Sequence, residues 1–107
     1  MTLTKAIKTA RLEVSQLLPC NGQWSMRTYD FDRKGWRESN QMSYSLAQAV
    51  RSSFLINRAL IALGMSLEDA DYYSQKYNSG SWVDFVRKYA KKIRQENELK
   101  AMYQSIN

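Results

Sequence analysis

Residues 43–65 read SYSLAQAVRSSFLINRALIALGM, a helical pattern that contains no proline and meets its first glycine at Gly64. Ser43 or Ser45 can cap its start, because a serine hydroxyl accepts a hydrogen bond from an otherwise unpaired backbone N–H. Gly64 suits the left-handed conformation that ends many helices. From Phe54 onward the apolar residues reach almost all the way round, which is typical of a helix packed between neighbours. We therefore expect a central helix on which the rest of the chain packs.

Two strips run along this predicted helix. The apolar strip, which we expect to face the core, consists of Leu46, Val50, Phe54 and Ile61. The polar strip consists of Gln48, Arg51, Ser52 and Arg58. Because Asn57 and Arg58 interrupt the longest apolar run, the pattern favours a core helix over a membrane span.

Length, composition and cysteine content indicate a small folded protein. The chain has 107 residues, of which 44% are hydrophobic and 24% charged, so one domain over residues 1–107 is predicted. Cys20 is the only cysteine, which excludes an intramolecular disulfide and fits a reducing cytosol. No signal-peptide pattern is present. We expect a cytoplasmic protein without membrane contact, as a monomer or weak homodimer.

Residues 2–18 are predicted to form an amphipathic helix. Its apolar face consists of Leu3, Ile7, Ala10, Val14 and Leu17. Thr2 or Thr4 can cap the start of this helix. The run Pro19-Cys20-Asn21-Gly22 is expected to stop the helix and turn the chain, because proline cannot continue a helix and Asn-Gly tolerates positive φ.

The next segment predicts a β-hairpin, with strands over Gln23–Phe31 and Trp36–Asn40 and a turn over Asp32–Gly35. The face expected to pack on the core carries Trp24, Met26, Thr28 and Trp36. The opposite face carries Arg27, Tyr29, Phe31 and Arg37, with Arg33 and Lys34 at the tip. Guanidinium and aromatic groups mixed in this way can stack on bases or pair with phosphates, although an ordinary exposed sheet face has the same composition.

Two further helices are predicted, with Ser66 and Ser81 as their N-caps. The first carries a narrow apolar stripe of Leu67, Ala70, Tyr73 and Tyr77. The second places five basic residues on one broad face: Arg87, Lys88, Lys91, Lys92 and Arg94. Its end carries a rotated apolar stripe of Leu99, Met102, Tyr103 and Ile106, which either folds back on the body or meets another chain. Together these patterns predict an α+β fold that is mostly helical, with an N-terminal helix, a β-hairpin and three helices packed around a central apolar helix.

Several kinds of chemistry have no support in the sequence. The chain has no histidine and a single cysteine, so the common zinc sites and the usual general base are missing. Its four glycines form no phosphate-cradling loop. We therefore predict a non-enzymatic protein without a cofactor or a metal. A net charge of +6, from 16 basic and 10 acidic residues, favours polyanions or acidic protein surfaces as partners, and also serves solubility.

A set of residues spread over the first half of the chain suggests a function: Val14-Ser15, Trp24, Thr28-Tyr29-Asp30, Trp36, Glu38-Ser39, Ser43-Tyr44, Ala47 and Arg51. In this set the chain resembles small proteins of phages and other mobile elements that inhibit bacterial defence, anti-CRISPR proteins among them. The resemblance implies stoichiometric inhibition through binding to a subunit of a CRISPR effector. Anti-CRISPR families share no common fold or site, so it assigns no functional residue.

Two functions are therefore considered. In the first, this basic protein binds a protein subunit of a larger bacterial nucleoprotein defence complex and occludes a site on it. In the alternative, the basic C-terminal helix binds nucleic acid directly, although no helix-turn-helix spacing or zinc module is present. The predicted partner-binding residues for either function are Arg87, Lys88, Lys91, Lys92 and Arg94, together with Arg27, Tyr29, Arg33, Lys34 and Arg37.

Overall fold

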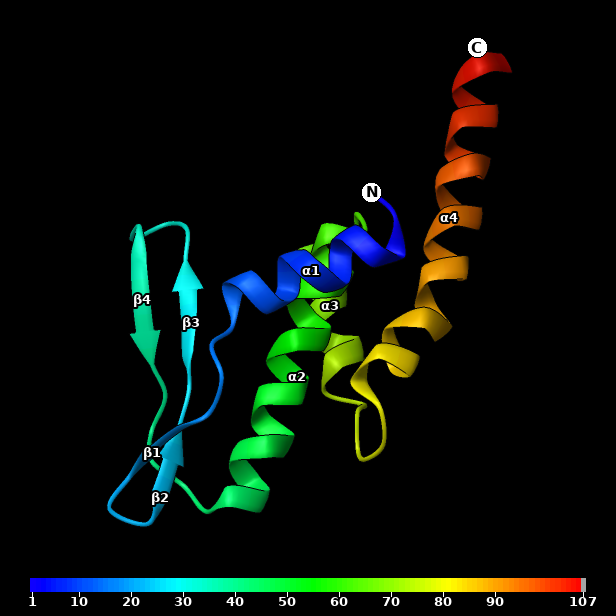
Figure 1. Ribbon diagram of the computed structural model, residues 1–107. Helices are drawn as coiled ribbons and strands as arrows, with labels where there is room; N and C mark the ends of the chain where they lie inside the picture. The colour runs from blue at the N-terminus through cyan, green and yellow to red at the C-terminus, as the bar shows by residue number, and fades with distance from the viewer. Residues whose placement is uncertain (107) are drawn as a thin grey trace.

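The computed structural model describes residues 1–106 and confirms the predicted α+β, mostly helical fold. Its elements are, in chain order, α1 (Leu3–Glu13), β1 (Leu18–Cys20), β2 (Gln23–Ser25), β3 (Arg27–Asp30), β4 (Gly35–Glu38), α2 (Tyr44–Ala62), α3 (Leu67–Ser74) and α4 (Trp82–Ile106). Helices α1, α3 and α4 all contact α2. Figure 1 shows α2 in the middle of the molecule, with the β3–β4 hairpin on one side and α4 on the other. The prediction of a central helix is therefore confirmed.

The ends of α2 follow the sequence prediction. Ser43 is the N-cap, and its hydroxyl accepts a hydrogen bond from the Leu46 backbone N–H at 3.4 Å. Gly64 takes a positive φ of 107° after the last turn. The Met65 N–H then donates to the Leu60 carbonyl oxygen at 3.0 Å, which satisfies a carbonyl that the helix leaves unpaired.

The buried face of α2 is not the predicted apolar strip. Leu46 is 54% exposed and Phe54 37% exposed, while Val50 and Ile61 are half-buried. The residues that the neighbouring elements cover are Ala47, Leu55, Ile56, Ala59 and Leu60. From Phe54 onward apolar side chains surround this helix on almost every side, so its periodicity alone could not identify the side on which α1, α3 and α4 pack.

Helix α1 begins as predicted but ends earlier. The Thr2 hydroxyl accepts from the Lys5 N–H at 3.2 Å, and Ile7 and Ala10 are buried. The helix stops at Glu13 because Val14 is extended and forms a β-bridge with Thr28. Leu18, the last residue of the predicted helix, belongs instead to strand β1 (Leu18–Cys20), since a residue that precedes proline is driven away from the helical conformation.

The predicted first strand of the hairpin is divided at Met26. Strand β2 pairs with β1 through a turn at Asn21 and Gly22, whose φ angles of 51° and 79° suit a tight hairpin. Strand β3 pairs with β4 in a separate two-stranded sheet. Between the two sheets, the Met26 side chain is fully buried, and its backbone N–H donates to the Ser39 hydroxyl at 3.1 Å.

The register of the β3–β4 hairpin also differs from the prediction. Tyr29 lies opposite Trp36, so Trp36 shares a face with Tyr29 and not with Thr28, which lies opposite Arg37. The turn begins at Asp30, whose carboxylate accepts from the backbone N–H groups of Asp32 and Arg33 at 3.0 and 3.2 Å. This side-chain cap moves the turn towards the N-terminus, which changes the pairing and therefore the face of each side chain.

The last two helices start where the sequence predicts. The Ser66 hydroxyl accepts from Asp69 N–H at 3.2 Å, and the Ser81 hydroxyl from Asp84 N–H at 3.3 Å. In α3, Ala70 is buried and Tyr73 half-buried, while the predicted stripe residue Leu67 is 69% exposed. That position lies in the first turn, where no neighbouring element covers it.

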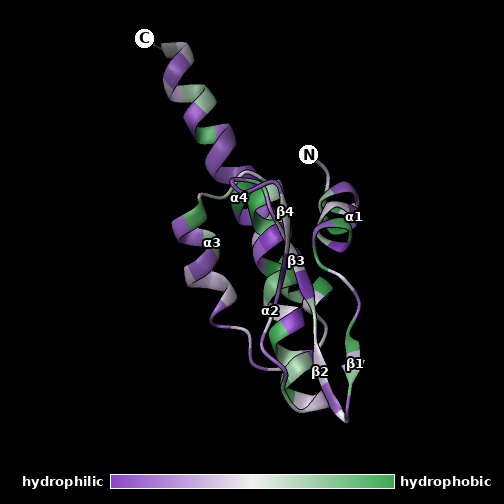
Figure 2. Ribbon diagram, turned by 90° about the vertical axis from the view of Figure 1, so that its left-hand side faces the viewer, coloured by the Kyte–Doolittle hydropathy of each residue, from purple (hydrophilic) through white to green (hydrophobic). Residues whose placement is uncertain are grey.

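The second half of α4 extends away from the rest of the molecule (Figure 1). After Ile93, residues 94–105 are all exposed, including Leu99, Met102 and Tyr103 at 53%, 60% and 69%. Figure 2 shows hydrophobic and hydrophilic residues alternating along this extension. The tail therefore does not fold back over the body, while the side chain of Ile106 and residue Asn107 lie outside the described part. Over residues 1–106, none of the helices has the length and apolar character needed to span a bilayer.

Candidate binding surfaces

The basic face of α4 consists of Arg87, Lys88, Lys91, Lys92 and Arg94. All five side chains are exposed, whereas Val86 and Ile93 on the other side of the helix are buried. Residues three and four apart lie on the same side of a helix, which places Arg87, Lys91 and Arg94 in one row. The fold therefore presents the five predicted basic residues of this helix to solvent together.

Few contacts neutralise this charge. Arg87 Nη1 lies 2.6 Å from Asp84 Oδ1, and this is the only ion pair that the basic face forms within residues 1–106. Lys92 Nζ lies 3.3 Å from the Tyr73 hydroxyl, a hydrogen bond that raises the pKa of Lys92. Lys88 Nζ lies over the ring of Tyr89 at 5.5 Å. Most of the basic face thus keeps an exposed positive charge that an anionic partner can meet.

Aromatic rings line the seam between α3 and α4, beside the basic face. Tyr73 and Tyr89 are in contact across the seam with ring centroids 4.8 Å apart, and Tyr72 packs edge-on against Tyr73 at 5.2 Å. Lys76 Nζ lies 4.4 Å from the centroid of Tyr72, which is 56% exposed. A hydrogen bond to Tyr72 raises the pKa of Lys76. The sequence prediction missed Lys76, because its position beside the basic face depends on how α3 packs on α4.

The remaining predicted residues, Arg27, Tyr29, Arg33, Lys34 and Arg37, lie in the β3–β4 hairpin. Its basic side chains are exposed, and Arg37 Nε lies 3.5 Å from Asp30 Oδ2. Tyr29 is half-buried, because its ring packs edge-on against the rings of Phe31 and Trp36. The ring centroids are 4.8 and 5.5 Å apart.

The rings most open to a partner on this hairpin are Phe31 and Trp36, which are 59% and 51% exposed. From α2, the Arg58 guanidinium donates to the Tyr29 carbonyl oxygen at 2.8 Å and lies 6.0 Å from the Phe31 ring. Figure 1 shows the β3–β4 hairpin on one side of α2 and α4, which carries the basic face, on the other. The ten predicted residues therefore form two separate groups, one on the β3–β4 hairpin and one on α4.

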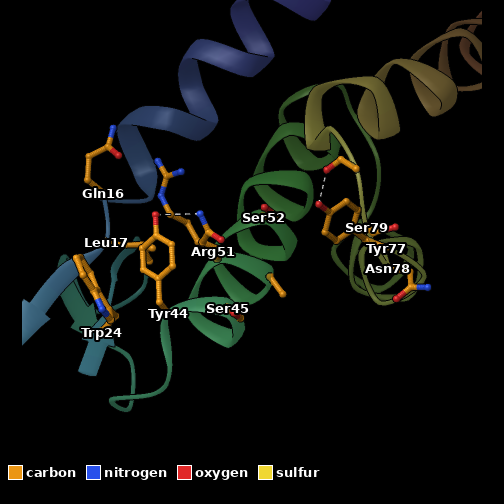
Figure 3. Close-up of a pocket in the computed structure, with 13 residues that line it drawn as sticks. Gln16, Leu17, Trp24, Tyr44, Ser45, Arg51, Ser52, Tyr77, Asn78 and Ser79 are labelled. Carbon is orange, nitrogen blue, oxygen red and sulfur yellow. Dashed lines mark hydrogen bonds between the residues drawn. The ribbon is translucent and has the colours of Figure 1, made fainter. Parts of the chain in front are cut away.

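A groove that the sequence did not indicate lies between the α1–β1 connection, the first half of α2 and the α3–α4 loop (Figure 3). It is open to solvent and has a volume of about 640 Å³. Aromatic, amide and hydroxyl side chains line it, among them Trp24, Tyr44, Gln48, Ser52 and Tyr77. Segments far apart in the chain build this groove, so no local pattern could have predicted it.

One charged side chain, Arg51, lines the groove. It is half-buried, and its Nε donates to the Ser15 carbonyl oxygen at 2.7 Å. Burial lowers the pKa of Arg51, and the nearby positive charge of Arg11 lowers it further. The groove therefore contains a poorly solvated cation with a second cation near it.

Comparison of the chain with protein-family models, curated proteins and solved structures returned no match. The surfaces of the molecule are thus the basis for any statement about function.

Proposed function

We propose that this protein is a non-enzymatic inhibitor that binds a bacterial nucleoprotein complex and occludes a site on it. The observation that carries the proposal is the basic face of α4, five exposed cations of which one forms an ion pair within residues 1–106. Like charges at helical spacing repel one another, so their concentration on one face has a cost that an anionic partner removes. The resemblance to anti-CRISPR proteins selects CRISPR effectors as the complexes to examine.

Charge and aromatic groups have different roles in this proposal. The basic face steers the protein to an anionic surface and speeds association, an effect that weakens as salt is added. Tyr72, beside it on α3, supplies an exposed ring of the kind that anchors many interfaces. The projecting part of α4 extends the contact area beyond the body of the molecule (Figure 1).

A titration of the purified chain into assembled CRISPR effectors, with target DNA cleavage as the readout, tests this function. A stoichiometric inhibitor lowers cleavage linearly and reaches an end point at a small whole-number ratio of protein to complex. Inhibition that continues to develop with time at far lower ratios would show turnover and contradict a non-enzymatic role. No effect on any member of a panel that covers the known effector types would contradict CRISPR inhibition.

Charge-reversal variants identify the surface. Lys91→Glu with Arg94→Glu removes four units of charge from the basic face and takes the net charge from +6 to +2. Lys5→Glu with Lys8→Glu makes the same change on exposed positions of α1 and is the matched control. The α4 pair should abolish most of the inhibition while the control retains it, with helical circular dichroism unchanged in both. Equal losses in the two variants would mean that only net charge matters.

Direct binding to nucleic acid is the second candidate, favoured by the tyrosine rings that lie beside Lys76 and Lys92. Aromatic rings and cations side by side are typical of surfaces that bind single strands. Fluorescence anisotropy with random duplex and single-stranded oligonucleotides over a salt series separates the two functions. Micromolar binding with a steep salt dependence supports direct recognition, whereas no binding at physiological salt favours a protein surface as the partner.

A further inference from the structure

Side-chain hydrogen-bond donors gather at the end of the groove near the α1–β1 connection, and no carboxylate among the described residues lines the groove to accept from them. Arg51 uses only its Nε for the Ser15 carbonyl oxygen, so the N–H groups at the tip of the guanidinium have no hydrogen-bond partner within residues 1–106. Gln48 Nε2 donates to the Tyr44 hydroxyl oxygen at 3.0 Å, which leaves the hydroxyl proton of Tyr44 as a further donor. Figure 3 shows the Arg51 guanidinium and the Tyr44 hydroxyl at the same end of the groove.

The charge balance of the groove favours an anion. Neither aspartate nor glutamate lines it, and among residues 1–106 Arg51 forms no ion pair. A half-buried guanidinium without a counter-ion is costly, and the neighbouring Arg11 increases that cost. An oxyanion bound to Arg51 removes this free-energy cost, because the planar guanidinium of arginine matches the oxygen atoms of a phosphate or carboxylate.

The rest of the groove favours a ligand with a planar group. Trp24 and Tyr44 meet edge to face with ring centroids 5.0 Å apart, and Tyr44 is 49% exposed. Ser45 and Ser52 line the floor formed by α2. The volume of about 640 Å³ lies within the range of small-ligand sites. The groove can therefore hold much more than an inorganic ion.

We propose that this groove binds a phosphate ester of nucleotide size, with its phosphate on Arg51 and Tyr44 and its base against the Trp24–Tyr44 pair. A free nucleotide and the phosphorylated end of a single strand share this chemistry. The groove shares no lining residue with the basic face of α4, and this proposal does not depend on the function proposed above.

Titration of the ¹⁵N-labelled full chain with AMP, followed by amide chemical shifts in NMR, tests the site. AMP should shift amides around residues 16, 44, 48 and 51 in a saturable way, and adenosine and inorganic phosphate should each bind at least tenfold more weakly. A 5′-phosphorylated tetranucleotide separates the two sources: tighter binding than AMP assigns a strand end, and equal or weaker binding assigns a free nucleotide. No shift at about 10 mM AMP, or shifts that gather on residues 87–94, would overturn the proposal.

Two variants test the donors. Tyr44→Phe removes one hydroxyl from an exposed side chain and should weaken AMP binding by about 2- to 10-fold. Arg51→Gln should weaken it by at least about tenfold, since the hydrogen bonds lost are charge-assisted. Tyr103→Phe and Arg33→Gln make the same changes at exposed positions outside the groove and should leave binding unchanged. If Arg51→Gln does not fold, Tyr44→Phe decides, and wild-type affinity in that variant contradicts the proposal.

Discussion

Substitution of Met26 by alanine should loosen both β-hairpins from the helical body. Among residues 15–42 only Ser25 and Met26 are buried, and Met26 is fully so. This side chain joins the core cluster that includes Leu55 and Leu60, and its backbone hydrogen-bonds to Ser39, the residue that follows β4. Met26 is thus the one fully buried side chain of residues 15–42 that links the hairpins to the core, beside partly buried neighbours such as Trp24.

The expected cost follows from the atoms removed. A fully buried methionine that is truncated to alanine loses its transfer free energy and leaves a cavity, a total of about 2–5 kcal/mol. A value near 3 kcal/mol is expected, because the site lies at a sheet break where the exposed strands can partly collapse. For a domain of this size the melting temperature should then fall by roughly 10–20 °C.

Urea and thermal unfolding, followed by far-UV and near-UV circular dichroism, measure this effect. Met102→Ala is the matched control, because Met102 is 60% exposed and should lose less than about 0.5 kcal/mol. Near-UV signals from the hairpin aromatic rings should weaken before the helical signal does, since the helices keep their own contacts. Equal stability of Met26→Ala and Met102→Ala would refute the view that Met26 anchors the hairpins.

Three further predictions follow from the helices. Burial raises the pKa of Glu13 more than the attraction of Arg58, 3.6 Å away, lowers it. The stabilisation from a protonated Glu13 is therefore present below its usual pKa of 4.5 and is lost as the pH rises through the raised folded value. Urea unfolding at about pH 4 to 7 should show wild type losing stability relative to Glu13→Gln, and the opposite trend would mean that the Arg58 pair dominates. Ser66→Ala, which removes the cap of α3, should cost about 1 kcal/mol in the same assay, and no change would show that the cap hydrogen bond is not formed in solution. The double variant Leu99→Ser with Tyr103→Ser should alter the melting temperature of a dilute sample by less than about 3 °C, because both side chains are exposed, and a large drop would show that the tail packs on something.

Local signals in the sequence predicted the starts of the helices well. Thr2, Ser43, Ser66 and Ser81 each cap the helix expected of them, since a cap needs only a side-chain oxygen and a backbone N–H a few residues away. The basic face of α4 was equally predictable, because helical spacing alone places its residues together. The candidate groove was not, since Trp24, Arg51 and Tyr77 come from segments that only the fold brings together.

The sequence by itself determined where the helices begin and that five cations share one side of the last helix. Those properties depend on interactions within a few residues of the chain. Only the tertiary structure decided that Leu46 and Phe54 of α2 are exposed and that the second half of α4 stands away from the body. Both outcomes depend on which distant element covers a surface, and burial is a property of that contact and not of the residue alone.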